Sequence, residues 1–79
     1  MTAVLRLYTR RDCPLCDEMK AAVRAAAEKV PLQLEEVDVD SAPGLAELYG
    51  SEVPVLFIDG RKAFKYRVTP AELEKRLRR

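Results

Sequence analysis

Hydrophobic and polar residues follow one another along the chain in a pattern that predicts alternating strands and helices. Residues 5–9 and 32–39 show the partial two-residue alternation that is typical of half-buried strands. Between them, apolar side chains recur every three or four residues from Leu15 to Val30, which predicts a helix with one buried face. This helix is expected to begin at the cysteines, with Pro14 at its first position, and to end before Pro31.

A second, shorter helix is predicted over residues 43–49, which begin with a proline and contain leucine and tyrosine at helical spacing. Asp40 or Ser41 would cap its first turn with a side-chain oxygen. Gly50 follows its last residue, where a left-handed conformation commonly ends a helix and favours glycine.

The most apolar run of the chain, residues 53–58, predicts a central strand that is buried on both faces. Asp59-Gly60 then predicts a two-residue hairpin turn. The returning strand would cover residues 62–66, and Tyr66 is expected to pack within it.

The last helix is marked by a capping box, in which Thr69 and Glu72 would bind each other's backbone N–H groups. Leu73 and Leu77 would face inward. The order strand–helix–strand–helix–strand–strand–helix predicts an α/β fold, with a four-stranded mixed sheet and three helices that cover both of its faces. With 79 residues and no linker or repeat, we expect a single domain over residues 1–79.

Composition narrows the classes of function. The chain has 14 basic and 13 acidic residues, a net charge of +1, and so lacks the positive excess of a nucleic-acid-binding surface. No apolar stretch is long enough to cross a membrane. The first residues lack the layout of a secretory signal. We therefore expect a cytoplasmic protein with neither a nucleic-acid nor a membrane partner.

The candidate chemistry lies in the only two cysteines, Cys13 and Cys16. The chain has no histidine, which excludes Ser-His and Cys-His nucleophile systems. Cys13 would lie at a helix N-terminus, where free N–H groups favour the thiolate. The preceding Arg10 and Arg11 would stabilise that thiolate further through their positive charge, whereas the negative charge of Asp12 would disfavour it. Cys16 lies one turn further along the same side, within reach of a disulfide.

This arrangement predicts a division of roles in which Cys13 attacks a substrate disulfide and Cys16 then releases the product. Such an exchange needs no bound cofactor, because the two sulfurs hold the electrons, and it needs only a monomer. Two alternatives stay open. In the first, the two cysteines are inert buried thiols. In the second, Cys13 belongs to an iron–sulfur or other metal-binding module that is shared in a dimer, because one chain offers only two cysteines whereas structural zinc takes four ligands.

Val53-Pro54 is the second candidate feature, because proline lacks the N–H that a strand ladder needs and is tolerated only at a strand's first residue or edge. A cis peptide at this position would turn the chain sharply and expose the Val53 backbone to a docking partner.

Taken together, the segments L-Y-T at 7–9, C-P-L-C at 13–16 and V-P-V-L-F-I-D-G at 53–60 resemble the glutaredoxin branch of the thioredoxin superfamily. The resemblance extends nearly end to end in element order. It implies that Pro54 is cis and faces the cysteine pair, and that the Val53 backbone pairs with a substrate strand. It also implies a thiol–disulfide oxidoreductase that passes electrons from a thiol reductant or a reductase to disulfide-containing proteins or glutathione.

The chain departs from that family in the stretch after the hairpin. Glutaredoxins usually carry a Gly-Gly pair and an acidic residue there to hold glutathione, whereas residues 63–69 read A-F-K-Y-R-V-T. The tryptophan-containing motif of thioredoxins is also absent, because the chain has no tryptophan. Arg11, together with Lys65 and Arg67, is the candidate for holding an anionic thiol substrate. Glutathione and a protein disulfide therefore both stay open as substrates.

Overall fold

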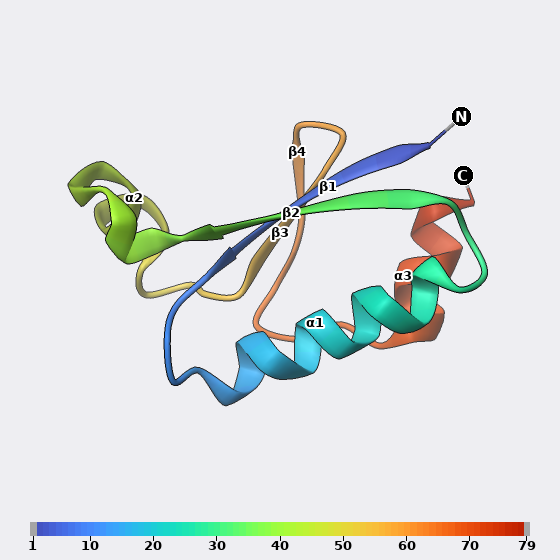
Figure 1. Ribbon diagram of the computed structural model, residues 1–79, viewed down its shortest axis with the longest axis horizontal. Coiled ribbons are helices and arrows are strands. Elements are labelled where there is room, and N and C mark those ends of the chain that lie inside the picture. The colour runs from blue at the N-terminus through green and yellow to red at the C-terminus, as the bar shows by residue number, and fades with distance from the viewer. Residues whose placement is uncertain (1, 79) are drawn as a thin grey trace.

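The computed structural model describes residues 2–78 and contains one four-stranded sheet with three α-helices and a short 3-10 turn, η1 (Figure 1). In chain order the elements are β1 (Ala3–Thr9), α1 (Pro14–Ala27), β2 (Leu32–Asp38), η1 (Val39–Ser41), α2 (Pro43–Tyr49), β3 (Val55–Ile58), β4 (Arg61–Lys65) and α3 (Pro70–Leu77). The strands lie in the order β2-β1-β3-β4. β1 runs parallel to β2 and antiparallel to β3, and β4 returns antiparallel to β3. The predicted α/β fold with a mixed sheet is confirmed.

Helices cover both faces of the sheet. Successive side chains of a strand point to opposite faces, so Leu5 and Leu7 of β1 pack under α1 and α3, whereas Tyr8 packs toward α2. Figure 1 shows α1 and α3 together on one side and α2 at the far end. The core on the α1 side contains the fully buried residues Leu5, Leu7, Met19, Val23, Ala26, Leu56 and Leu73.

A smaller cluster lies on the α2 side of the sheet and is built around aromatic rings. The Tyr8 ring stacks on the Tyr49 ring at a centroid distance of 4.3 Å, and Phe57 meets Tyr8 edge-on at 5.5 Å. Val39 and Val55 complete this cluster and are fully buried. Helix α2 has only seven residues and therefore covers only one end of the sheet, the end at which β1 finishes.

Several predicted boundaries, among them those of the first strand and the first helix, are wrong by one to three residues. The first strand starts at Ala3, because Ala3 already pairs with Leu32 of β2. Helix α1 ends at Ala27 instead of Val30, and Ala27 is exposed. The reason is Pro31, which disfavours helical backbone at the residue before it, so the chain leaves the helix in a tight turn in which Val30 N–H donates to the Ala26 carbonyl.

The predicted cap of the second helix is also wrong. Asp40 and Ser41 belong to η1, where the Asp38 carboxylate accepts the Asp40 N–H at 2.8 Å and the Asp38 carbonyl accepts the Ser41 hydroxyl at 2.6 Å. The N-cap of α2 is Ala42, whose side chain can accept no hydrogen bond. The polar residues of this segment therefore stabilise the turn before α2 and leave the helix itself uncapped by a side chain.

Gly50 is not left-handed, contrary to the prediction, since its φ is −56°. Glycine is needed there for space. A Cβ atom would lie 2.5 Å from the Ala46 carbonyl oxygen and 2.9 Å from Nη2 of Arg10. The carbonyl of the preceding helical turn, with the Arg10 guanidinium beside it, thus explains this glycine.

The hairpin confirms the Asp59-Gly60 turn, in which both residues have positive φ, 48° and 84°. β3 begins at Val55, one residue after Pro54. The predicted burial of this strand on both faces is confirmed only for Val55 and Leu56, because its last two residues are half-buried. The predicted packing of Tyr66 is wrong. Tyr66 lies beyond the end of β4, is 43% exposed and has a φ of 68°.

The last helix, α3, starts as predicted. The Thr69 hydroxyl accepts the Glu72 N–H at 3.1 Å, and the Glu72 carboxylate accepts the Thr69 N–H at 3.1 Å. Leu73 is fully buried and Leu77 packs against the same core. No helix within residues 2–78 is both long and apolar enough to span a bilayer.

Candidate redox site

The loop that follows β1 brings Cys13 to the start of α1. Asp12 adopts the left-handed conformation, with a φ of 53°, which short polar residues tolerate better than most. This reversal leaves Cys13 extended, with φ −113° and ψ 102°, as the N-cap residue. Pro14 then occupies the first helical position, where its lack of an N–H leaves no hydrogen bond unmade.

Cys13 and Cys16 form a disulfide, so the structure describes the oxidised state of the pair. Their Cα atoms lie 5.2 Å apart, within the usual range for such a bond. Cys13 is half-buried, whereas Cys16 is 1% exposed. An incoming molecule can therefore reach the sulfur of Cys13 far more readily than that of Cys16.

The sulfur of Cys13 occupies the position of an N-cap acceptor. The Cys16 N–H donates to Sγ of Cys13 at 3.1 Å, and the Asp17 N–H donates to the Cys13 carbonyl at 3.2 Å. An anion at this place is favoured by the free N–H groups and by the positive end of the helix dipole. The local geometry therefore suits a thiolate on Cys13 once the disulfide is reduced.

Arg10 anchors the loop after β1 to η1 and to the C-terminal end of α2. Its Nε and Nη2 atoms donate to the two carboxylate oxygens of Asp40, each at 3.0 Å, and Nη1 donates to the Gly50 carbonyl at 3.0 Å. These contacts raise the pKa of Arg10 and lower the pKa of Asp40, in each case chiefly through the hydrogen bonds between them. The guanidinium of Arg10 thus has a structural role that sequence reasoning missed.

Arg11 has no such anchor. It is exposed and forms no ion pair or side-chain hydrogen bond with the rest of residues 2–78. Its position directly before Asp12 and Cys13 keeps it in the same loop as the reactive pair. Lys65, the second candidate cation, pairs instead with Glu52 at 3.5 Å.

Val53-Pro54 lies at the same edge of the sheet as the cysteine loop. The peptide bond before Pro54 is cis, as the family resemblance implied. Because Tyr8 pairs with Val55 in antiparallel register, the end of β1 and the start of β3 are neighbours. In the part of the chain that the structure describes, the N–H and C=O of Val53 join no backbone hydrogen bond. These two groups therefore have no backbone partner within residues 2–78.

Tyr66 is the second residue that sequence reasoning missed. Its N–H donates to the Pro54 carbonyl at 2.9 Å, so the tyrosine adjoins the Val53-Pro54 segment. Nothing in the sequence signals this placement, since the alternation of 62–66 predicts a buried tyrosine and a positive φ favours glycine.

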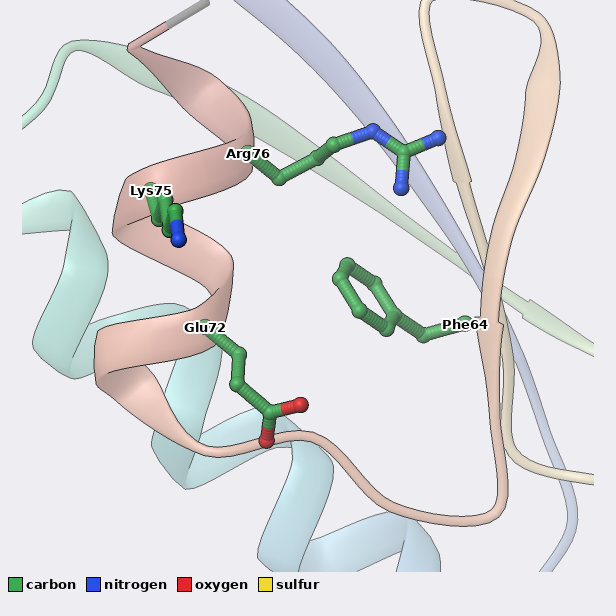
Figure 2. A pocket seen from close by; sticks show the side chains of 4 residues that line it. All are labelled: Phe64, Glu72, Lys75 and Arg76. Carbon is green, nitrogen blue, oxygen red and sulfur yellow. The ribbon is translucent and has the colours of Figure 1, made fainter.

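A separate cleft of about 590 Å³ lies between β4 and α3 and is lined by Phe64, Glu72, Lys75 and Arg76 (Figure 2). The guanidinium of Arg76 lies 5.7 Å from the centroid of the Phe64 ring. Neither cysteine and none of the other predicted site residues borders this cleft.

Comparison with known proteins assigns the chain to a family. The family described as "Glutaredoxin-like domain (DUF836)" matches residues 4–78. The chain belongs to this glutaredoxin-like family. The protein is similar to Ne2328 from Nitrosomonas europaea, with 30% identity, 98% of this chain and 93% of that chain covered, and a TM-score of 0.83. It is also similar to XcR50 from X. campestris, with 32% identity, coverage of 94% and 95%, and a TM-score of 0.76.

A more distant likeness concerns the fold alone. Mitochondrial thioredoxin 3 from Saccharomyces cerevisiae, in its oxidised form, is 20% identical, with 96% of this chain and 76% of that chain covered and a TM-score of 0.69. The glutaredoxin-like chain thus has a thioredoxin-like fold. Together with the adjacent, disulfide-bonded cysteines, the family and the fold support a redox function in thiol–disulfide chemistry.

Proposed function

We propose that this glutaredoxin-like protein is a thiol–disulfide oxidoreductase that reduces disulfides by dithiol exchange through Cys13 and Cys16. The observation that carries the proposal is the unequal exposure of two bonded sulfurs at the start of α1. One sulfur is within reach of a partner and lies at the helix N-terminus, and the other is buried behind it.

The exchange begins from the reduced protein. The thiolate of Cys13 attacks one sulfur of the substrate disulfide, a new S–S bond forms, and the other substrate sulfur leaves as a thiolate that takes up a proton. Cys16 then loses its proton and attacks Sγ of Cys13, which releases the second substrate thiol. The substrate gains two electrons, and the protein ends with the Cys13–Cys16 disulfide that the structure contains.

A second exchange must return the protein to its dithiol state. An external dithiol, two molecules of a monothiol, or a reductase supplies the two electrons. The same exposed sulfur of Cys13 is the point of attack, because Cys16 is inaccessible. Arg11 and the open Val53 backbone lie at the same edge and are the proposed contacts for the incoming chain.

The two cysteines are predicted to fail in different ways when each is replaced. Reduction of insulin with dithiothreitol as the electron source should be lost in Cys13→Ser, because no nucleophile remains. When reduced Cys16→Ser is mixed with insulin in the absence of dithiothreitol, it should retain the first attack and accumulate a mixed disulfide, which is visible as a mass adduct that dithiothreitol then removes.

Full insulin reductase activity in Cys13→Ser would contradict the assigned roles. The metal-binding alternative gives a different result, since protein purified without oxygen would then be a coloured dimer. A colourless monomer that reduces insulin supports the dithiol mechanism.

A further inference from the structure

Tyr66 combines an unfavourable backbone conformation with an exposed aromatic ring. A φ of 68° is rare for a bulky residue, yet two hydrogen bonds hold the segment in place. The Tyr66 N–H donates to the Pro54 carbonyl at 2.9 Å, and the Arg67 N–H donates to the Lys65 carbonyl at 2.8 Å. Side chains that a fold keeps in such conformations are concentrated at functional sites.

The ring of Tyr66 has no role in the core. It belongs to neither hydrophobic cluster and is 43% exposed. Within residues 2–78, its ring forms no aromatic pair, and its cation–π contact is with the ammonium of Lys65, which lies 5.5 Å from the ring centroid and is itself paired with Glu52. A partly exposed tyrosine with a free ring face is typical of residues that anchor a bound polypeptide.

Tyr66 adjoins one part of the proposed redox site and precedes a segment that lies against α1. On one side it is hydrogen-bonded to Pro54, next to the open Val53 backbone. On the other side, the residues that follow it, Arg67 to Thr69, line a cavity of about 190 Å³ together with Glu18 and Met19 of α1. In Figure 1 the connection from β4 to α3 passes beside the first half of α1, the helix that the cysteines begin.

The same region is unfavourable for a small anionic thiol such as glutathione, which carries two carboxylates. The cavity has one guanidinium, that of Arg67, against the carboxylates of Glu18 and Glu72. The nearby N-terminus of α3 offers little to an anion. Its N-cap and third-residue N–H groups are bound within the Thr69–Glu72 capping box, and Pro70 has no N–H.

From these observations, and resting on the proposed function, we infer that Tyr66 is a specificity-determining residue that favours protein disulfides over glutathione disulfide. The substrate is an extended polypeptide segment that carries the disulfide. Its backbone pairs with the Val53 N–H and C=O, and an apolar or aromatic side chain beside its cysteine packs on the Tyr66 ring.

The test compares two disulfides in a single turnover, which requires no added reductant. Fully reduced protein is mixed with insulin or with glutathione disulfide, and formation of the Cys13–Cys16 bond is followed by acid quenching, thiol alkylation and mass measurement. The wild-type rate constant should be larger with insulin. Tyr66→Ala should lower the insulin-to-glutathione ratio by about tenfold, a size common for loss of an aromatic anchor.

Two variants serve as controls. Tyr66→Phe keeps the ring and should keep the ratio within about twofold, equal to ~0.4 kcal/mol. Leu48→Ala removes another exposed apolar side chain, 66% accessible on α2, and should leave the ratio unchanged. If Tyr66→Ala does not fold, Tyr66→Gly replaces it, because glycine accepts positive φ.

An unchanged ratio in Tyr66→Ala, an equal loss with both substrates, or a wild-type preference for glutathione disulfide would each overturn the inference. Those outcomes differ from failure of the proposed function, in which neither disulfide oxidises the wild-type dithiol.

Discussion

The two glycines of the α2 region should respond in opposite ways to the same substitution. Gly50 has a right-handed backbone that any residue adopts, so alanine meets no conformational penalty there. Its Cβ would however lie 2.5 Å from the Ala46 carbonyl oxygen and 2.9 Å from Nη2 of Arg10. The arginine can yield, but the carbonyl belongs to the helix backbone and cannot move alone. Overpacking of this kind costs about 1–3 kcal/mol.

Gly44 lies within α2, and a Cβ there would meet no atom within 4 Å. Alanine is better than glycine in a helix by about 0.5–1 kcal/mol, so Gly44→Ala should raise the free energy of unfolding by that amount. Thermal unfolding followed by circular dichroism measures both variants. A change of 1 kcal/mol shifts Tm by roughly 4–8 °C in a domain of this size.

The expected result is a lower Tm for Gly50→Ala and a higher Tm for Gly44→Ala, each relative to wild type. A Gly50→Ala protein as stable as wild type would refute the explanation of this glycine by close approach. A gain of similar size in both variants would show that helix propensity alone governs the two sites.

Two further predictions concern the core and the Arg10 anchor. Leu73→Ala removes a fully buried side chain that joins α3 to the core and should cost about 2–5 kcal/mol in urea unfolding. A loss below about 1 kcal/mol would contradict its place in the core. The hydrogen bonds from Arg10 lower the pKa of Asp40 in the folded protein below the usual carboxyl value of 3.8. The ionised Asp40 therefore stabilises the folded state at pH values above 3.8, and this stabilisation is lost as pH falls through the lower pKa of the folded state. Arg10→Gln should therefore make the urea midpoint fall less steeply below that pH than in wild type, and an identical slope would contradict the assignment.

The sequence predicts best where one short segment determines the local structure. Pro14, Asp59-Gly60 and the Thr69–Glu72 pair carry their preferences within a few residues, and the corresponding helix starts and hairpin turn are confirmed. Cys13 and Cys16 belong to this group, because their spacing along a helix already places both sulfurs within bonding distance.

The sequence predicts least where distant segments meet. Gly50 follows the last helical residue, where the sequence predicts a left-handed backbone, but its carbonyl accepts Nη1 of Arg10 from 40 residues earlier and its backbone is right-handed. Tyr66 continues the alternation of its strand, but the hydrogen bond to Pro54 turns it outward into positive φ. In both cases a tertiary contact overrides a local preference, and local patterns contain no information about that contact.

Strand direction explains why these separate features gather at one end of the molecule. β1 and β2 are parallel and end at the same edge, which brings Arg10 to Asp40 of η1. β3 is antiparallel to β1 and therefore begins at that edge, with Val53-Pro54 before it, and β4 returns there and ends beside Tyr66. The opposite edge receives the Asp59-Gly60 turn, where Asp59 accepts the Val4 N–H at 2.9 Å. A mixed sheet of this order thus assembles the reactive sulfur on its anchored loop, an unpaired backbone segment and an exposed aromatic ring from three different segments, while the other edge holds the hairpin turn.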